Sequence, residues 1–365
     1  MAAIELSRVT KHFDGREVLS QLDLEVPSGS LTVLVGPSGS GKSLILRMVA
    51  GLERPDSGTV TVGGEVVGAS GRAPQGVAMV FQGDTLYAHL DVGDNLRFPL
   101  QVGGADRDHV EAVSRDSARR IGITRLWRRR TGTLSSGERG LAAAARAISR
   151  DGLAVLLLDE PLAGADPPLR RRFRSELRQL HDTEGVTTVV ATNDQEEALA
   201  LADRLAVVMD ARIVQTGSPR TVFESPDSTS VASFVGVLPM NLFPGEFGRG
   251  DDGSFVDVAG NRLSIDGRVE VPDGARVVVG LHAHELVVAP PGTPFGRTIQ
   301  GTVSRVEDFG ATVSVLFGLG RDAVGTFVMT ENRPAAWPPG DRLELTRAPD
   351  RLRLFRADTG RAIPM

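Results

Sequence analysis

The segment that most constrains the fold of this chain is a glycine-rich run near its start. It fits the pattern G-x-x-x-x-G-K-[ST] and consists of Gly36, Pro37, Ser38, Gly39, Ser40, Gly41, Lys42 and Ser43. An apolar strand, Leu31–Val35, precedes it, and a helical stretch, Ser43–Ala50, follows. Glycines let consecutive backbone N–H groups point into one concavity, and the helix N-terminus adds positive potential. The run therefore predicts a phosphate-binding loop that holds a nucleotide.

Acidic residues further along the chain add a candidate reaction to this loop. Lys42 is expected to reach the β- and γ-phosphates, and the Ser43 hydroxyl to bind Mg²⁺. The apolar run Ala154–Leu158 ends in Asp159 and Glu160. The first carboxylate suits Mg²⁺, and the second is placed to polarise an attacking water. Together these residues predict hydrolysis of a nucleoside triphosphate, with ATP and Mg²⁺ as the expected cofactors.

Composition excludes several other classes of function. The chain has 365 residues and no cysteine, which removes disulfides, thiol catalysis and cysteine-ligated metals. Its net charge of -5 argues against sequence-independent binding to nucleic acid. No apolar run approaches the roughly 18–20 residues that span a bilayer, and the start lacks the pattern of a secretory signal. We therefore expect a soluble chain that meets a membrane through partner proteins.

The pattern of the chain predicts an α/β domain over residues 1–235 and a small β-barrel domain over 236–365. Short apolar runs separated by helical stretches predict a mainly parallel sheet. An Arg-rich helical subdomain is expected as an insertion at about 84–150, with the run of arginines at 128–130 on a solvated face. Ser225–Val235 is expected to be the joining helix. The strands expected in the first domain are Leu31–Val35, Val77–Phe81, Ala154–Leu158, Thr187–Ala191 and Leu205–Met209.

Further motifs resemble those of the ABC transporter ATPases, in particular importer subunits of the maltose type with a C-terminal regulatory (OB- or TOBE-like) β domain. Residues 134–138 lie where that family has its signature, so the resemblance implies that Ser135, Ser136, Gly137 and Glu138 of one subunit close on ATP held by another. Gln82 resembles the Q-loop glutamine that touches Mg²⁺. Phe13 resembles the aromatic residue that stacks on adenine. The alternative is that Phe13 is an ordinary residue of the hydrophobic core. Residues 162–166 occupy the D-loop position. The implied site residues are Phe13, Val18, Gly36 to Leu44 and Ser135 to Glu138 for ATP, Ser43, Gln82 and Asp159 for Mg²⁺, and Glu160, Gln82 and Asn193 for catalysis.

The chain departs from the family pattern at four positions. Asn193 stands where a switch histidine is expected, and an amide can donate a hydrogen bond but cannot carry a proton charge. Ser136 replaces a glycine and is expected to limit backbone torsions. Glu138 replaces a glutamine and is expected to place negative charge near a polyphosphate. Leu44 replaces a hydroxyl residue, which implies a lost α-phosphate contact. These departures predict slow turnover.

The C-terminal stretch also resembles the regulatory domain of sugar-importer ATPases, at residues 238–244 and at Leu352–Arg361. His282 and His284 lie two apart in an expected strand, so they are expected to face the same side. A metal site there is the less favoured interpretation, because the sequence offers no third ligand. The expected role of this domain is to stabilise a dimer and offer a regulatory surface.

The resemblance implies an ATPase that energises import of a sugar or sugar derivative, including glycerol-phosphate types. Its implied partners are a second ATPase subunit in a homodimer or heterodimer, two transmembrane permease subunits and, indirectly, an extracytoplasmic substrate-binding protein. Its implied place is the cytoplasmic face of the bacterial inner membrane. One alternative is a weakly hydrolysing regulatory subunit. Another is the same role in a sulfate, iron, molybdate or polyamine importer.

Overall fold

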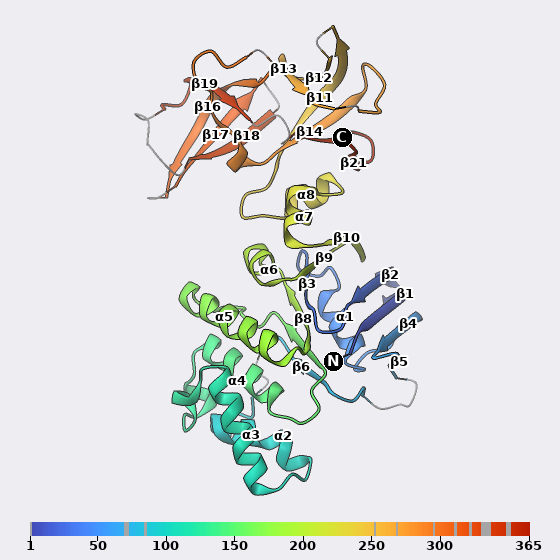
Figure 1. Ribbon diagram of the computed structural model, residues 1–365, viewed down its shortest axis with the longest axis vertical. Helices are drawn as coiled ribbons and strands as arrows, with labels where there is room; N and C mark the ends of the chain where they lie inside the picture. The colour runs from blue at the N-terminus through green and yellow to red at the C-terminus, as the bar shows by residue number, and fades with distance from the viewer. Residues whose placement is uncertain are drawn as a thin grey trace. The chain divides into compact units, whose positions relative to one another are not determined.

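A computed structural model shows two compact units, Met1–Pro219 and Arg220–Met365 (Figure 1). The structure describes residues 2–68, 73–83, 86–251, 253–267, 269–294, 296–309, 312–320, 323–329, 337–347 and 352–365. The division falls before the helices that precede residue 236, because these helices bond to the second unit: the Thr229 amide donates to Gly360 O, for example. The first residues of the expected helical subdomain, Asp84 and Thr85, lie outside the described residues.

A six-stranded sheet forms the centre of the first unit, in the order β10-β9-β3-β8-β7-β6. All neighbours are parallel except β9 and β10, which confirms the prediction of a mainly parallel sheet. Its strands β3, β7 and β8 are buried along their whole length, as apolar runs covered on both faces must be. The strands are β3 (Leu31–Val35), β6 (Val77–Val80), β7 (Val155–Asp159), β8 (Thr187–Thr192), β9 (Arg204–Met209) and β10 (Arg212–Gly217).

A second sheet in this unit was not among the predicted elements. It is antiparallel, in the order β2-β1-β4-β5, and its alternating residues bury one face against α1. Leucine, isoleucine and valine on this face join the core under the phosphate loop, so the sheet supports the loop's helix from the side. Its strands are β1 (Ile4–Phe13), β2 (Arg16–Val26), β4 (Ser57–Val62) and β5 (Glu65–Val66).

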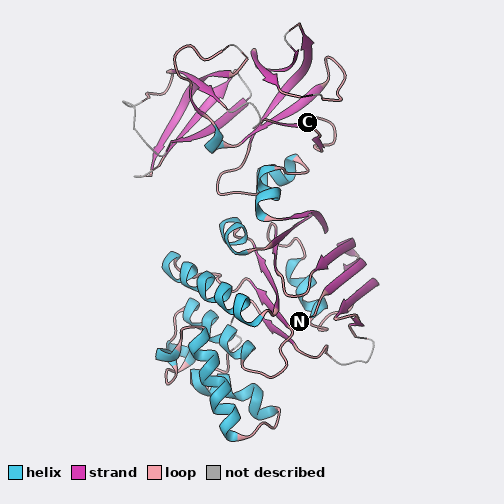
Figure 2. Cartoon of the chain, in the orientation of Figure 1, coloured by secondary structure: helices cyan, strands magenta, loops and turns pink. Residues whose placement is uncertain are grey.

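The helices of the first unit lie on the sheet or form the predicted insertion (Figure 2). The insertion contains α2 (Val92–Val102), α3 (Arg107–Arg120) and α4 (Ser136–Ile148), with the 3₁₀ helices η1 (Thr124–Leu126) and η2 (Thr131–Thr133) between them. The remaining helices are α1 (Lys42–Val49), α5 (Pro167–Glu184) and α6 (Gln195–Leu201). None of the helices formed by described residues is long and apolar enough to cross a membrane.

The second unit begins within α7 (Pro219–Glu224), and α8 (Thr229–Phe234) follows. The expected helix Ser225–Val235 is therefore too long at its start, because Pro226 disfavours a helical residue before it and Ser228 caps α8 by accepting from the Val231 amide. Two antiparallel sheets follow, in the orders β13-β12-β11-β14-β20-β21 and β15-β19-β16-β17-β18. Buried residues from both sheets form one core, an arrangement compatible with the small barrel that we expected.

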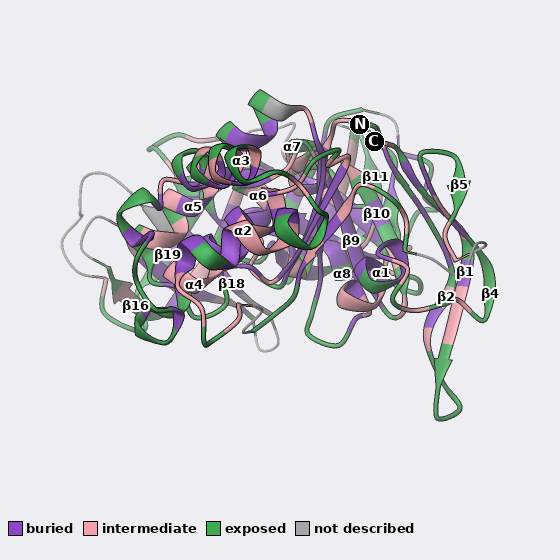
Figure 3. Cartoon of the chain, turned by 90° about the horizontal axis from the view of Figure 1, so that it is seen from below, coloured by how far each residue is buried: buried purple, intermediate pink, exposed green. Residues whose placement is uncertain are grey.

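The strands of the second unit are β11 (Asn241–Gly250), β12 (Gly253–Val258), β13 (Asn261–Ile265), β14 (Arg276–Leu281), β15 (Val287–Val288), β16 (Thr298–Asp308), β17 (Val313–Leu319), β18 (Ala323–Met329), β19 (Arg342–Thr346), β20 (Arg353–Arg356) and β21 (Ala362–Ile363), with the 3₁₀ helix η3 (Ala283–Glu285) after β14. In both units buried residues concentrate on the strands and on the inner faces of the helices (Figure 3). The hydrophobic cluster of the second unit and the cluster beneath the phosphate loop in the first unit consist of residues of one unit each.

Candidate functional site

The phosphate loop connects β3 to α1 and needs glycine at both of its ends. A Cβ on Gly36 would lie 2.1 Å from the carbonyl oxygen of Val208, which belongs to the adjacent strand β9. Gly41 has a φ of 102° and caps α1, and a Cβ there would lie 2.6 Å from Leu19 Cδ2. Because no side chain fits at Gly36 or Gly41, backbone groups line the concavity of the phosphate loop at these two positions. The loop has the geometry in which backbone N–H groups bind phosphate.

Lys42 lies beneath this loop with only 4% of its surface exposed. Its Nζ donates to the carbonyl oxygens of Gly36 and Pro37, each at 2.8 Å. Burial lowers the pKa of Lys42, and the charges of Glu160 and Asp159 oppose that shift. The side chain thus presents a partly desolvated cation on the loop, where a phosphate oxygen can replace the carbonyl contacts.

Ser43 and Asp159 come together although they are far apart in the sequence. Ser43 Oγ donates to Asp159 Oδ1 at 2.8 Å, where α1 begins and β7 ends. Burial raises the pKa of Asp159, while the Ser43 hydrogen bond and the charges of Arg47 and Lys42 oppose the shift. Within the described part of the chain, no three His, Cys, Asp or Glu residues are grouped as metal ligands. The Ser43–Asp159 oxygen pair fits Mg²⁺, which takes few protein ligands and completes its shell with phosphate and water oxygens.

Glu160 follows Asp159 in a backbone conformation that non-glycine residues rarely adopt, with a φ of 43°. Its amide donates to Ala191 O at 2.8 Å, which fixes this turn to β8. Its carboxylate accepts a hydrogen bond of 2.8 Å from Gln82 Nε2. Unfavourable torsions that the surrounding structure maintains are concentrated at functional sites. The structure therefore places the predicted base and the predicted glutamine side by side.

Asn193 lies just after β8, and its Nδ2 donates to Ser38 Oγ in the phosphate loop at 3.4 Å. The next residue, Asp194, caps α6 by accepting from the Glu197 amide and pairs with Arg170. Arg170 also donates from Nε to Ala165 O at 3.0 Å. Arg170 thus ties the Asn193 turn to residues 162–166. Sequence reasoning missed this arginine, because nothing in the pattern of α5 distinguishes it from its neighbours.

Glu138 is held in place at the start of α4. Ser135 and Glu138 form a capping box at the start of α4: the Glu138 amide donates to Ser135 Oγ at 3.2 Å, and the Ser135 amide donates to Glu138 Oε2 at 3.1 Å. Glu138 also pairs with Arg129 at 3.3 Å and Arg125 at 3.6 Å. The carboxylate is therefore held and balanced by arginines. Arg128, Arg129 and Arg130 are all exposed, as expected of a solvated face, and Arg129 is also one of the partners of Glu138.

Ser136 is also tolerated better than we expected. Its φ is not positive, so the α4 backbone at this position does not require glycine. Its Oγ donates to Gly164 O at 2.9 Å. Gly137 is the position without room for a side chain, since a Cβ there would lie 1.9 Å from Leu169 Cδ2. The signature segment thus keeps glycine where packing demands it.

Three other residues were predicted to contact ATP: Phe13, Val18 and Leu44. Phe13 ends β1 and is 44% exposed, so it is not a core residue, and Lys11 Nζ lies 5.2 Å from its ring centroid. The carbonyl oxygen of Val18 would lie 3.3 Å from a Cβ on Gly41. Leu44 packs against the core of the first unit.

Described hydrogen bonds join the predicted residues into two groups. Lys42, Ser43, Gln82, Asp159, Glu160 and Asn193 connect to one another or to the phosphate loop. No hydrogen bond or ion pair joins residues 135–138 to residues 36–43 within the described residues of the chain. Ser136 nevertheless lines one cavity with Gln82 and Glu160, so the signature segment lies beside these residues of its own chain without a described hydrogen bond to the phosphate loop.

In the second unit, His282 and His284 do not lie on a strand. β14 ends at Leu281, and both histidines belong to the turn of η3, because His282 precedes that helix. Their rings lie 5.2 Å apart, and both stack on Phe223. His282 Nε2 hydrogen-bonds to Phe223 O at 2.9 Å. The pair anchors α7, and no metal cluster is found among the described residues.

Burial lowers the pKa of His282 to about 4, and nearby His284 adds to the shift while the Phe223 hydrogen bond opposes it. Between about pH 6.5 and 4 the unfolded chain therefore binds a proton that the native chain does not. We expect the free energy of unfolding of the second unit to fall by up to about 3 kcal/mol as the pH drops through this window. Trp337 fluorescence during urea unfolding of a Trp127→Phe background would measure it, because Trp127 lies in the first unit. His282→Gln should remove most of the fall and exposed His284→Gln should not; an unchanged fall in His282→Gln would contradict the assignment.

Comparison with known proteins identifies close relatives of the whole chain. Residues 19–163 match the family model described as ABC transporter. The sn-glycerol-3-phosphate import ATP-binding protein UgpC 1 of Rhizobium johnstonii is 35% identical over 100% of this chain and 96% of its own length. The sulfoquinovosyl glycerol transport ATP-binding protein SmoE of Agrobacterium fabrum is 36% identical over 100% of both chains. A UgpC protein of Cereibacter sphaeroides is 38% identical over 100% of both.

A solved structure supports the fold of the first unit. The dimeric structure of a bacterial ABC transporter cassette matches with a TM-score of 0.54 at 23% identity, over 60% of this chain and 99% of that chain. At this identity the match bears on the fold alone. The similarity to the curated relatives extends over the second unit as well.

Proposed function

Because this chain belongs to the ATP-binding subunits of ABC transporters, we propose that its hydrolysis of ATP energises import of a sugar or sugar derivative. The observation that carries the catalytic part is the joined set of Lys42, Ser43, Asp159, Glu160 and Gln82. The substrate class rests on the curated relatives, whose names specify sn-glycerol-3-phosphate and sulfoquinovosyl glycerol. A glycerol-phosphate or a glycosylated glycerol is the substrate class favoured here.

In this proposal each residue has a defined task. Lys42 and the loop amides hold the β- and γ-phosphates, and exposed Phe13 offers its ring to adenine. Ser43 and Asp159 would hold Mg²⁺, which neutralises phosphate charge when bound. Glu160 accepts a proton from the attacking water, and Gln82 orients its carboxylate. Asn193 donates its amide hydrogen to the γ-phosphate from its place beside Ser38.

The signature segment supports a dimer in which each chain completes the other's site. Ser135 and the start of α4 present a helix N-terminus that is not joined to the phosphate loop of the same described chain. A helix N-terminus favours an anion, so a second subunit's γ-phosphate is the natural ligand. Permease subunits at the cytoplasmic face of the membrane complete the proposed importer.

Asn193→His tests the proposed role of the switch position. We expect the imidazole to add a charge-assisted hydrogen bond to the γ-phosphate and to raise the rate of phosphate release about tenfold, because a hydrogen bond to a charged group contributes about 1.5–3 kcal/mol. Phosphate release from the purified chain with Mg²⁺ and ATP measures it. An equal or lower rate in Asn193→His would show that the native amide does not limit turnover.

The second candidate is a regulatory subunit that binds ATP with little hydrolysis, and Asn193 is the observation that favours it. The two candidates separate in the same assay, because a regulatory subunit would bind ATP with no measurable phosphate release. The substrate class is tested separately by co-purifying the permease partners and measuring uptake of labelled sn-glycerol-3-phosphate into reconstituted vesicles. Uptake of sulfate or polyamine in its place would overturn the sugar assignment.

A further inference from the structure

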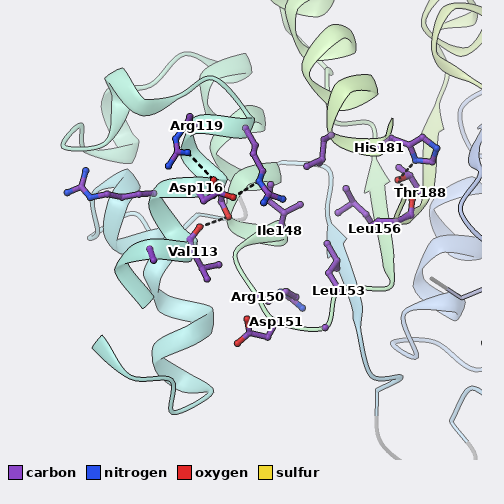
Figure 4. A pocket seen from close by; sticks show the side chains of 17 residues that line it. Val113, Asp116, Arg119, Ile148, Arg150, Asp151, Leu153, Leu156, His181 and Thr188 are labelled. Atoms are coloured by element: carbon purple, nitrogen blue, oxygen red, sulfur yellow. Dashed lines mark hydrogen bonds and ion pairs between the residues drawn. The ribbon is translucent and has the colours of Figure 1, made fainter. Parts of the chain in front are cut away.

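A cavity of about 770 Å³ opens in the first unit at the end of the central sheet opposite the phosphate loop (Figure 4). Leu153, two residues before β7, and Val186, directly before β8, line it, whereas Asp159 ends β7 and Asn193 follows β8 at the other end of these strands. α3 forms the second wall, so the cavity lies between the helical insertion and the sheet. Its volume falls within the range of small-molecule sites, about 300–1,000 Å³.

The side of this cavity next to the sheet is mostly apolar, and its polar residues Thr188 and His181 hydrogen-bond to each other at 3.3 Å. Leu153, Leu156, Leu180 and Val186 line it, together with Ile148 at the end of α4. Leucine and valine side chains give the hydroxyl groups of a free sugar no hydrogen-bond partner. An apolar body would instead bury surface against them and gain roughly 25 cal/mol per Å².

The charged residues of the α3 wall are already paired. Asp116 pairs with Arg119 at 3.3 Å and also with Arg120. Arg115 pairs with Glu111 at 2.5 Å, and its guanidinium lies 4.6 Å from the ring centroid of Trp127. These pairs account for most of the charge that Figure 4 shows on this side.

Arg150 is different. Its Nη1 donates to Val77 O at 3.3 Å, and its Nε is buried without a partner. No carboxylate of the described residues lies within ion-pair distance of it, and its neighbour Asp151 instead contacts His109 at 3.0 Å. Burial, reinforced by the charge of Arg146, lowers the pKa of Arg150. A partly desolvated guanidinium without a counter-ion is unfavourable, and an anion beside it would remove that cost.

We propose that this cavity binds a small amphiphilic anion, with a carboxylate or phosphate head on Arg150 and an apolar body over Leu153 and Leu156. The site lies at the end of the sheet opposite the ATP site and is independent of the transported substrate. A guanidinium fork recognises both head groups by the same paired hydrogen bonds. The apolar body supplies the selectivity against inorganic phosphate.

Calorimetric titration of the full-length chain without nucleotide tests the proposal, with sodium octanoate and octyl phosphate as probes. Both should bind with micromolar to low-millimolar affinity. Octanamide, which has the same shape without the charge, and inorganic phosphate, which has no apolar body, should each bind about tenfold more weakly or worse. Trp127 reports on the α3 wall, because Arg115 of the cavity lies over its ring: in a Trp337→Phe background it is the single tryptophan, and its fluorescence should change with octanoate. Equal binding of octanamide or of inorganic phosphate would overturn the proposal.

Variants separate the cavity from non-specific binding. Arg150→Gln should weaken octanoate binding about tenfold, whereas Arg107→Gln, at an exposed position on α3 outside the cavity, should leave it unchanged. If Arg150→Gln fails to fold, Ala112→Trp decides, because Ala112 is an exposed residue on the cavity rim and an indole there would obstruct the opening. Octanoate binding of native strength in either folded variant would show that the site is not this cavity. ATP hydrolysis by native protein, measured in parallel, tests the proposed function independently.

Discussion

Replacing Glu160 by Gln is expected to lower the rate of ATP hydrolysis at least about a hundredfold while ATP binding persists. A positioned general base contributes about 10²- to 10⁴-fold to rate, and an amide cannot take the proton of the attacking water. The substitution keeps the shape of the side chain, and its amide can still hydrogen-bond to Gln82. The residues that contact phosphate, among them Lys42 and Ser43, are not altered. Phosphate release and equilibrium ATP binding measure the two quantities separately.

Glu25→Gln is the matched control for this experiment, because Glu25 is an exposed glutamate on β2, outside the site. It should hydrolyse ATP at the native rate. Hydrolysis by Glu160→Gln within about threefold of the native rate would remove Glu160 from the role of base. The unfavourable backbone torsion of Glu160 would then no longer indicate a catalytic role for this residue.

Gly36→Ala is expected to destabilise the first unit by about 2–3 kcal/mol or more and to weaken ATP binding with it. The added methyl group would lie 2.1 Å from Val208 O, and this atom belongs to the backbone of β9 and cannot rotate away. Overpacking of this kind forces a backbone shift, typically at about 1–3 kcal/mol. Gly36 has no positive φ, so the clash alone carries the effect. Urea unfolding of the native and variant chains measures the difference.

Gly132→Ala supplies the control, since nothing lies within 4 Å of a Cβ at that exposed position and its φ is not positive. Its stability should stay within about 0.5 kcal/mol of the native value. If Gly36→Ala unfolded at the same urea concentration as Gly132→Ala, β3 and β9 would have to separate more easily than their packing indicates.

The departures from the family pattern take a different meaning in the structure than they have in the sequence. Glu138 replaces a neutral residue, and this predicted repulsion of ATP. In the structure its charge is balanced by Arg125 and Arg129, while its carboxylate completes the cap of α4. Ser136 binds Gly164 O instead of restricting the backbone. Asn193 and Leu44 remain as the departures that predict slow turnover.

Local patterns in the sequence were sufficient for the phosphate loop, the parallel strands and the carboxylates at the end of β7. Each depends on residues that are close together in the chain: glycines that permit a tight loop, and apolar runs that need burial on both faces. The antiparallel sheet of β1, β2, β4 and β5 could not be predicted in this way. Its strands pair across register shifts, which break the simple alternation of the sequence.

The contacts between residues that are distant in the sequence depend on the three-dimensional fold. The Ser43–Asp159 and Gln82–Glu160 hydrogen bonds, the Arg170 bridge to the Asn193 turn and the unpaired Arg150 in its cavity all depend on side chains from separate elements. Whether a charge such as Glu138 or Arg150 has a partner depends on distances of a few ångströms in the fold. Spacing along the chain does not determine those distances, because the loops between the elements set the geometry. Residue types and their local spacing are enough to identify the groups that can hold ATP, and the packing of the sheet determines which of them share one site.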